Sequence, residues 1–106
     1  MSTAFWKGNW QFLEMNFYRM HYVYMLLCQG GRIYTGYATD VQKRFEAHCA
    51  GKGAKFTRAF PPQKILKIFE LESKHDALRL EAFIKKCAPE AKRSFIALPN
   101  GKLPDF

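Results

Sequence analysis

Two tyrosines, an arginine, a histidine and a glutamate are the side chains whose types and spacing could carry chemistry. They are Tyr24, Tyr34, Arg44, His48 and Glu81. Hydrolysis of a phosphodiester needs a deprotonated water, stabilisation of charge on the phosphoryl oxygens and help for the leaving alkoxide. The planar guanidinium of Arg44 can hold two non-bridging oxygens, which a lysine does less well. Glu81 suits Mg²⁺, because this ion keeps most of its waters and takes further oxygens from a phosphate.

Each of these residues also has a plain structural explanation. An unperturbed tyrosine has a pKa of about 10, so Tyr24 or Tyr34 could act as a base only beside cations such as Arg44 or a metal ion. Tyrosines on a strand are usually packing residues, and a lone histidine is more often structural than catalytic. A lone helical charge is more often solvated or paired. The set therefore predicts phosphate chemistry only if the fold brings its members together.

The first element expected to position them is a β-hairpin. The segment HYVYMLLC (21–28) is rich in strand-forming residues, QGG supplies a turn, and RIYTGYA (32–38) forms a second strand. Side chains alternate along a strand, so Tyr24 lies on one face of the first strand, and Tyr34 shares a face of the second with Gly36.

A helix is expected next, over 41–50, with Thr39 or Asp40 as its cap. Its apolar side chains recur at every fourth position and predict the buried stripe: Val41, Phe45 and Cys49. Arg44 and His48 are also four residues apart. They lie one turn from each other on a neighbouring face, close enough to act on one ligand.

Glycines and prolines bracket a basic loop that is expected to be exposed and mobile. Its cations are Lys52, Lys55 and Arg58, and Phe56 lies among them. This pattern predicts a surface that follows a phosphate backbone and offers one ring for stacking, although a simple solvated loop is the alternative. Four more lysines would extend this surface or are scattered solubilising charges: Lys64, Lys67, Lys85 and Lys86.

The remaining elements are a third strand over 64–71 and two helices. Ser73 and Asp76 resemble a capping box at the start of a helix over 75–88. The apolar stripe of this helix is predicted to be Ala77, Leu80, Ile84 and Cys87, with Glu81 at its border. A last helix is expected over 90–97.

The expected fold is therefore α/β, a small antiparallel three-stranded sheet flanked by helices in the order β-β-α-β-α-α. The 106 residues allow one domain. We expect that domain to span 21–98, after an N-terminal appendage (1–20) and before a C-terminal tail (99–106). The appendage is rich in aromatic residues, which could dock on the body, and internal methionines leave open a later start of the chain.

Composition narrows the class of protein. The net charge of +8 and a pI of 9.6 favour a polyanionic partner such as nucleic acid. Three widely spaced cysteines predict neither a disulfide framework nor a zinc cluster. No apolar run approaches the roughly 20 residues that span a bilayer, and the N-terminus lacks the layout of a signal peptide. We therefore expect a cytoplasmic protein with reduced thiols and no membrane partner.

The ordered combination of these motifs resembles the GIY-YIG nuclease superfamily. The run Tyr-Val-Tyr (22–24) precedes Tyr-Thr-Gly (34–36) by the right distance, and TDVQKRFEAHCAGKGAKFTR and ALRLEAFIKK follow. Within the superfamily the chain is most similar to the small single-domain bacterial members, which themselves resemble the Slx1-type nuclease domain. The resemblance covers residues 22–98.

The resemblance implies roles for individual residues. Tyr24 and Tyr34 would line the site, one as general base and the other positioning the water, and family members differ in which does which. Gly36 would allow close approach of the backbone. His48 would assist near the phosphate or the second tyrosine, and Glu81 would bind Mg²⁺ or Mn²⁺.

The chain departs from the family pattern in three respects. Its first motif begins with Tyr-Val where the family has Gly-Ile, and its second has Thr in the middle. Tyr37 stands where some repair-type relatives carry a lysine thought to help activate the water. No accessory zinc-binding domain is expected, so tight independent substrate specificity is not expected either.

Three functions remain open at this point. The first is a metal-dependent DNA endonuclease, with a preference for branched or damaged structures and a role in DNA repair or recombination. The second is a nucleic-acid-binding module of the same fold with little or no catalysis. The third is a protein-interaction domain that uses the N-terminal aromatic residues.

Overall fold

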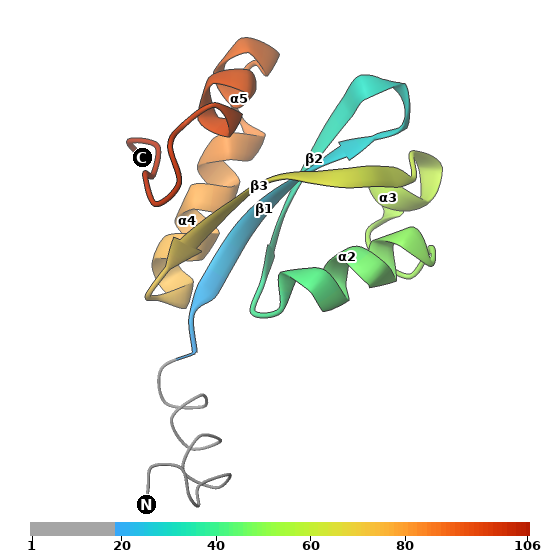
Figure 1. The fold of residues 1–106 in the computed structure, drawn as a ribbon, viewed down its shortest axis with the longest axis horizontal. Helices are drawn as coiled ribbons and strands as arrows, with labels where there is room; N and C mark the ends of the chain where they lie inside the picture. Colours follow the sequence, from blue (N-terminus) through green and yellow to red (C-terminus); the bar gives the residue numbers. More distant parts are fainter. Residues whose placement is uncertain (1–18) are drawn as a thin grey trace, which may run out of the picture.

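A computed structural model describes residues 19–106, and its centre is a three-stranded antiparallel sheet (Figure 1). The strands are β1 (His21–Cys28), β2 (Arg32–Ala38) and β3 (Pro62–Leu71), in the order β2-β1-β3. This confirms the predicted fold class. The prediction that N-terminal aromatic residues dock on the body concerns residues outside the described range.

The β1–β2 hairpin has the predicted boundaries. Its turn, η1 (Gln29–Gly31), places Gly30 and Gly31 at φ 78° and 77°, a left-handed conformation that glycine adopts without steric cost. In the resulting register Tyr24 is the partner of Gly36. The hairpin therefore places the two motifs opposite each other.

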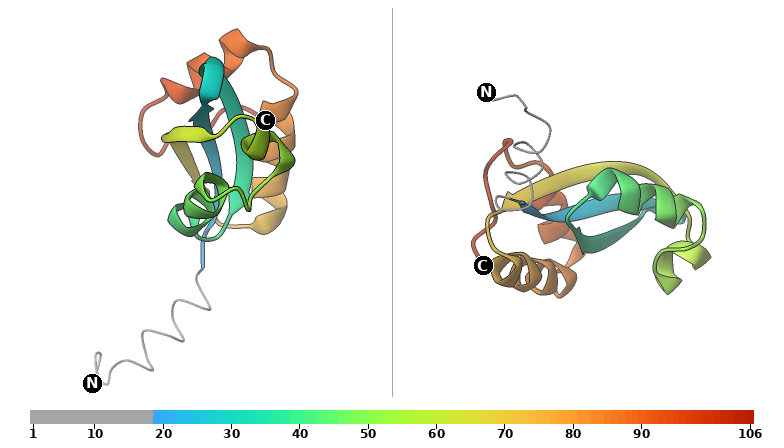
Figure 2. Two further views of the ribbon diagram at one scale, coloured as in Figure 1. Left: turned by 90° about the vertical axis from the view of Figure 1, so that its right-hand side faces the viewer. Right: turned by 90° about the horizontal axis from the view of Figure 1, so that it is seen from below.

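Helices cover both faces of the sheet (Figures 1 and 2). In the described part of the chain they are α2 (Val41–Cys49), α3 (Lys55–Ala59), α4 (Lys74–Lys85) and α5 (Pro89–Ile96). Asp40 caps α2 by accepting a hydrogen bond from the Lys43 backbone N–H at 3.0 Å. Ser73 caps α4 in the same way, accepting from the Asp76 N–H at 3.0 Å. Asp40, and not Thr39, is thus the cap of the first long helix.

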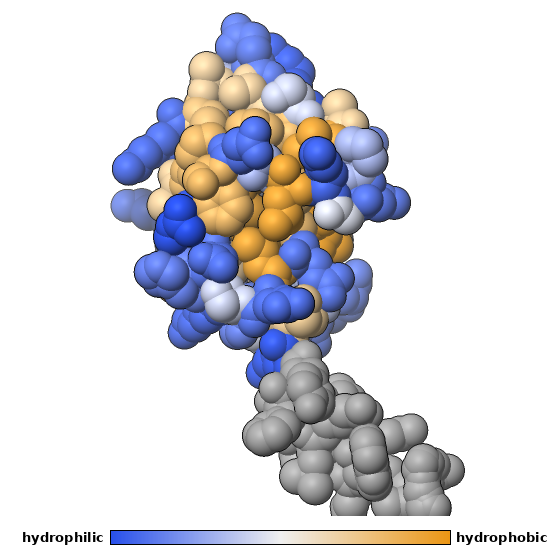
Figure 3. Space-filling model, turned by 90° about the vertical axis from the view of Figure 1, so that its left-hand side faces the viewer, coloured by the Kyte–Doolittle hydropathy of each residue, from blue (hydrophilic) through white to orange (hydrophobic). Residues whose placement is uncertain are grey.

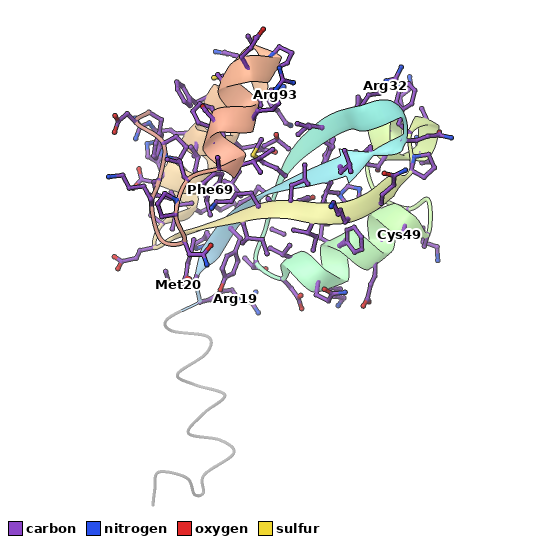
Figure 4. The ribbon with its side chains drawn as sticks, turned by 45° about the horizontal axis from the view of Figure 1, so that its top comes forward. Arg19, Met20, Arg32, Cys49, Phe69 and Arg93 are labelled. Carbon is purple, nitrogen blue, oxygen red and sulfur yellow. The ribbon has the colours of Figure 1, made fainter. Side chains whose placement is uncertain are left out.

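The side chains on the two sides of β1 pack into two different hydrophobic cores. Val23 and Met25 point to the face covered by α4, where Leu80 and Ile84 are completely buried. Phe69 of β3 lies in the same core, between the sheet and the helices on that side (Figure 4). The alternate side chains, with Tyr24 among them, point to the face covered by α2.

The basic segment after α2 is not the mobile loop that its glycines predicted. Residues 55–59 form α3, in which the Arg58 N–H donates to the Ala54 carbonyl at 3.1 Å and the Phe60 N–H to Phe56 at 2.9 Å. Thr57, at its centre, is 1% exposed. This helix has no side-chain cap, so tertiary contacts of its inner residue hold it in place.

The predicted buried stripe of α2 was wrong at its last position. Val41 is buried, but Cys49 is exposed at the outer end of the helix (Figure 4) and His48 is buried instead. Seven helical residues at about 100° each return a side chain to within about 20° of its starting direction, whereas eight leave it about 80° away. His48 therefore faces the sheet with Val41.

The C-terminal part of the chain packs against the core. In the predicted stripe of α4, Ala77, Leu80 and Ile84 are buried, whereas Cys87 follows the end of the helix and is only partly buried. Leu103 packs against the α4 core and Pro104 is buried. On this side of the molecule apolar side chains are surrounded by hydrophilic ones (Figure 3). Within residues 19–106 no helix is long and apolar enough to cross a membrane.

Candidate active site

The site lies at the β2 edge of the sheet. There the side chain of Tyr24, from β1, extends across β2 at Gly36, which has no side chain to block it. A Cβ on Gly36 would overlap the phenol ring of Tyr24, with the hydroxyl among its nearest atoms. The missing side chain thus lets the Tyr24 hydroxyl lie over β2. The close approach expected at Gly36 is made by this tyrosine, which is 1% exposed.

A chain of buried hydrogen bonds starts at this hydroxyl. The Tyr24 Oη lies 2.8 Å from His48 Nε2, and His48 Nδ1 lies 2.7 Å from Thr57 Oγ1. The Thr57 hydroxyl in turn donates to the Ala54 carbonyl at 3.0 Å. One histidine from α2 therefore connects β1 to α3.

The direction of these bonds follows from the single proton on the threonine. If Thr57 donates to the Ala54 carbonyl, its oxygen must accept from Nδ1–H of His48. A neutral imidazole then has a bare Nε2, which accepts from the Tyr24 hydroxyl. A rival bond from the Ala54 N–H to Nδ1 would require the opposite tautomer, but at 3.4 Å it is the longest in the group. We therefore assign the proton to Nδ1.

The imidazole is also fixed by the backbone of the segment before α3. A Cβ on Gly53 would overlap the His48 ring at Nδ1, Cε1 and Cγ. Only glycine fits at this position without moving the histidine. Gly53 therefore serves close packing, and its sequence-based interpretation as a loop breaker was incomplete.

Burial sets the pKa values of the two bonded groups. Burial above all, with Tyr34 next, raises the pKa of Tyr24 to about 12, while Arg44 opposes this shift. Burial and the Arg44 charge lower the pKa of His48 below 6.5. At neutral pH the pair is thus a neutral phenol that donates to a neutral imidazole.

Arg44 and Glu81 come from helices on opposite faces of the sheet, and both lie close enough for their charges to influence Tyr24. Both charges act on the pKa of Tyr24: Arg44 of α2 lowers it and Glu81 of α4 raises it. Arg44 also lines an open hollow of ≈ 440 Å³ together with Tyr37 and Lys43. The β2 edge therefore carries one cation and one carboxylate near the same hydroxyl.

Glu81 is the acid that could hold a divalent ion here. Its side chain is 19% exposed and pairs with the Lys85 ammonium at 3.2 Å. No cluster of three or more metal-ligating side chains occurs among residues 19–106. This donor set fits Mg²⁺, which binds through one or two carboxylates with waters and substrate phosphates. It does not fit zinc, which takes four protein ligands or three.

Tyr34 lies at the centre of an aromatic cluster beside this pair. Its ring is 6.4 Å from Tyr24 and 5.1 Å, edge-on, from His48. Phe56 of α3 stacks on it at 5.8 Å, and Lys85 Nζ is 5.8 Å from its ring centroid. The five residues predicted from chemistry thus converge on one edge of the sheet.

The predicted cationic surface is partly present. Lys52, Lys55 and Arg58 are exposed and stand outside the two ion pairs found in residues 19–106, which are Arg79–Asp76 and Lys85–Glu81. Lys67 does not extend this surface, because its ammonium donates to the Leu98 carbonyl at the β3 side of the fold. Lys85 belongs to the site itself.

Sequence reasoning missed Thr57 and Gly53. A threonine nine residues beyond a histidine has no periodic relation to it once a turn intervenes, so no local signal marks Thr57. The glycine was visible but was assigned to loop flexibility. Tyr37, noted as a departure, bonds through its hydroxyl to His21 Nδ1 at 2.7 Å, so it is engaged away from the Tyr24–His48 pair.

Comparison with known proteins identifies the family of this chain. Residues 20–92 match the family model described as the GIY-YIG catalytic domain. A UPF0213 protein of Streptococcus sanguinis is 49% identical over 75 residues, covering 71% of this chain and 86% of that protein. A UPF0213 protein of Halobacterium salinarum is 43% identical, with 71% and 97% covered.

A solved structure is also similar. The solution NMR structure of a UPF0213 protein from Bacillus halodurans is 40% identical to this chain. The match covers 77% of this chain and 87% of the chain in that structure, with a TM-score of 0.51.

Proposed function

The chain belongs to the GIY-YIG catalytic domain family, and from this premise we propose that it is a metal-dependent nuclease that hydrolyses phosphodiester bonds in DNA. The observation that carries the proposal is the convergence at the β2 edge. There the charges of Arg44 and Glu81 both act on the Tyr24 hydroxyl, which donates to His48. Phosphoryl transfer needs such positioned charge more than it needs covalent chemistry.

Arg44 and Glu81 take the two electrostatic roles. The Arg44 guanidinium neutralises charge on the non-bridging oxygens as it develops. Glu81 would hold Mg²⁺ or Mn²⁺, which when bound supplies positive charge at the phosphate and lowers the pKa of a water. The Lys85 ammonium holds the carboxylate in place and must give way to such an ion.

We assign the general-base role to Tyr24, because it is the tyrosine that already has a proton acceptor. The Tyr24 oxygen takes a proton from the attacking water as its own O–H proton moves to His48 Nε2 at 2.8 Å, so no free phenolate has to form. Arg44 favours negative charge on this oxygen, since its charge lowers the pKa of Tyr24. Tyr34, half-buried and 6.4 Å away between ring centroids, then positions the water.

One observation favours a rival function, a nucleic-acid-binding module with little catalysis. The pKa of Tyr24, about 12, is far from neutral, so the resting site is a poor base. Under this alternative the exposed cations of the α3 segment bind the phosphate backbone, and the tyrosine–histidine pair is structural.

A substrate panel decides between the two. Labelled branched, flapped, nicked, single-stranded and duplex DNA, with matched RNA, would be incubated with Mg²⁺, Mn²⁺ or a chelator. We expect cleavage of a DNA substrate with a metal ion, with branched or damaged DNA preferred. Arg44→Ala should reduce the rate by about 100- to 1000-fold and Glu81→Ala should abolish it.

The controls are exposed charges on the same helices. Glu46→Gln on α2 and Arg79→Ala on α4 should leave the rate within a few-fold of wild type, and unfolding curves should show that every variant is folded. Binding without cleavage of any substrate would support the binding module. Full activity in Glu81→Ala would overturn the metal-site assignment.

A further inference from the structure

Phe56 is a large apolar side chain at the surface beside the catalytic pair. It is 36% exposed, whereas Phe69 in the core is 2% exposed. The other large exposed apolar residues of the described chain are Ile68, Leu78 and Phe106. Of these four residues, Phe56 is the one whose ring stacks on a residue of the candidate active site, Tyr34, at 5.8 Å between ring centroids.

The ring belongs to an aromatic row with Tyr34 and Phe60, and it is the most exposed of the three. Its plane is inclined by 30° to that of Tyr34, and the Phe60 ring lies 5.3 Å away, tilted by 55°. Phe60 is covered in turn by the Arg32 guanidinium, 3.9 Å from its ring centroid. Arg32 reaches it from the end of the β1–β2 hairpin (Figure 4). The row therefore leaves Phe56 as the ring with the most exposed surface.

The short helix that carries this ring is fixed to the active site. The residue after Phe56 is Thr57, whose hydroxyl is 2.7 Å from His48 Nδ1. Gly53 packs on the same imidazole just before the helix. Phe56 thus keeps a set position relative to the Tyr24–His48 pair.

The residues around the ring suit a nucleic-acid strand. Lys55 comes just before Phe56 in α3 and Arg58 two residues after it, and Lys52 precedes the helix. All three are exposed and lie outside the ion pairs of residues 19–106. Cations that follow a backbone, with an aromatic ring between them, are the usual features of a site for single strands.

We propose that Phe56 is a stacking platform for an unpaired nucleobase next to the phosphate that is cleaved. The inference rests on the proposed nuclease function and specifies its substrate class, a strand with at least one unstacked base at the cut site. A base within a continuous duplex has both faces covered by its neighbours, so it cannot use the ring. Every base has a π-face, so the platform selects structure and not sequence.

The test measures the binding of nucleic-acid probes in the presence of a chelator, which prevents metal-dependent cleavage. The probes are oligonucleotides with a fluorescent aminopurine base in a single strand, in a flap beside a junction, or inside a continuous duplex, each as DNA and as RNA. We expect quenching of the fluorescence for single-stranded and flap probes and none for the duplex. The arm with the stronger quenching identifies DNA or RNA as the preferred strand.

Substitutions of Phe56 measure what its aromatic ring contributes to binding. Phe56→Ala should weaken binding of unpaired probes by about 5- to 150-fold, the equivalent of about 1–3 kcal/mol, and leave duplex binding nearly unchanged. Phe56→Trp should restore binding. Phe56→Leu, which keeps an apolar side chain without a π-face, should not, and this variant controls for loss of folding. Leu78→Ala, another exposed apolar residue, is the matched control.

The outcomes separate this inference from the nuclease proposal. Equal losses on unpaired and duplex probes, no quenching, or full binding by Phe56→Leu would overturn the platform. Quenching that depends on Phe56, in a protein that cleaves no substrate with any metal, would overturn the nuclease and retain the platform as a binding site.

Discussion

The two faces of the sheet bury their side chains for different reasons. On the α4 face the buried side chains are apolar except that of Thr35, and the apolar cluster is Val23, Met25, Phe69, Leu71, Ala77, Leu80 and Ile84. On the α2 face two buried residues are polar, His48 and Thr57, and both are hydrogen-bonded. One face therefore stabilises the domain by removing apolar area from water, and the other holds polar atoms in set directions.

This difference shows why a domain this small can carry a buried polar site. A buried polar group costs free energy unless it is bonded, so the polar face contributes less stability than the apolar face. Glu81 lies between the two, next to Leu80 in α4, so one helix both fixes the core and supplies the acid of the site. Mutations on the two faces should separate stability from chemistry.

The largest expected effect is on the apolar face. Leu80→Ala should lower the free energy of unfolding by about 2–5 kcal/mol, because Leu80 is 0% exposed and leaves a cavity. Denaturant unfolding measures it. Leu78→Ala, on the same helix but 42% exposed, should change stability by about 0.5 kcal/mol or less. Similar losses in both variants would contradict the assignment of the core.

The second largest loss of stability is expected from substitutions on the polar face. Thr57→Val should cost about 1–3 kcal/mol of unfolding free energy, because it leaves His48 Nδ1 buried without its partner. Thr57→Ser keeps the hydroxyl and should retain most of that stability. If Val and Ser cost the same amount in thermal or denaturant unfolding, the hydroxyl is not what holds the histidine.

A smaller change in the free energy of unfolding, a gain and not a loss, is expected from substitution of Thr35. This residue is 3% exposed, lies on the α4 face of β2, and its Oγ1 has no hydrogen-bond partner among the described residues. Thr35→Val keeps the shape and removes the unbonded hydroxyl, so it should stabilise the fold by about 1 kcal/mol. A destabilised variant in the same unfolding assay would show that the hydroxyl is bonded.

His48 makes the stability of the fold depend on pH below 6.5. Because the folded-state pKa of His48 lies below 6.5, the unfolded chain takes up the proton first as the pH falls through 6.5. The contribution of His48 to stability is thus complete above 6.5 and declines toward its folded pKa. His48→Gln should lose this part of the pH dependence in unfolding curves, whereas exposed His75→Gln should keep it.

Sequence reasoning located the hairpin and the caps because these depend on neighbours in the chain. A run of β-formers, two adjacent glycines and a serine three residues before an acid act locally. It placed Glu81 at the border of the core for the same reason, since helical spacing alone decides it.

What the sequence could not predict depends on contacts between distant segments. Helical geometry directs His48 closer to the Val41 side than Cys49, but hydrophobicity favoured the cysteine. Burial of the histidine is favourable because Tyr24 and Thr57, both distant in sequence, bond to its ring. The helix α3 is five residues long, too short to form by itself. Its bond to His48 and the packing of Gly53 decide its place.

The polar face holds His48 as a proton acceptor for Tyr24. The direct measurement is isotope-edited NMR of labelled histidine, which distinguishes a protonated Nδ1 from a protonated Nε2. The structure predicts a neutral ring with the proton on Nδ1, toward Thr57, and a bare Nε2 toward Tyr24. Thr57→Val should shift this balance toward Nε2–H. A wild-type protein with its proton on Nε2 would contradict the account.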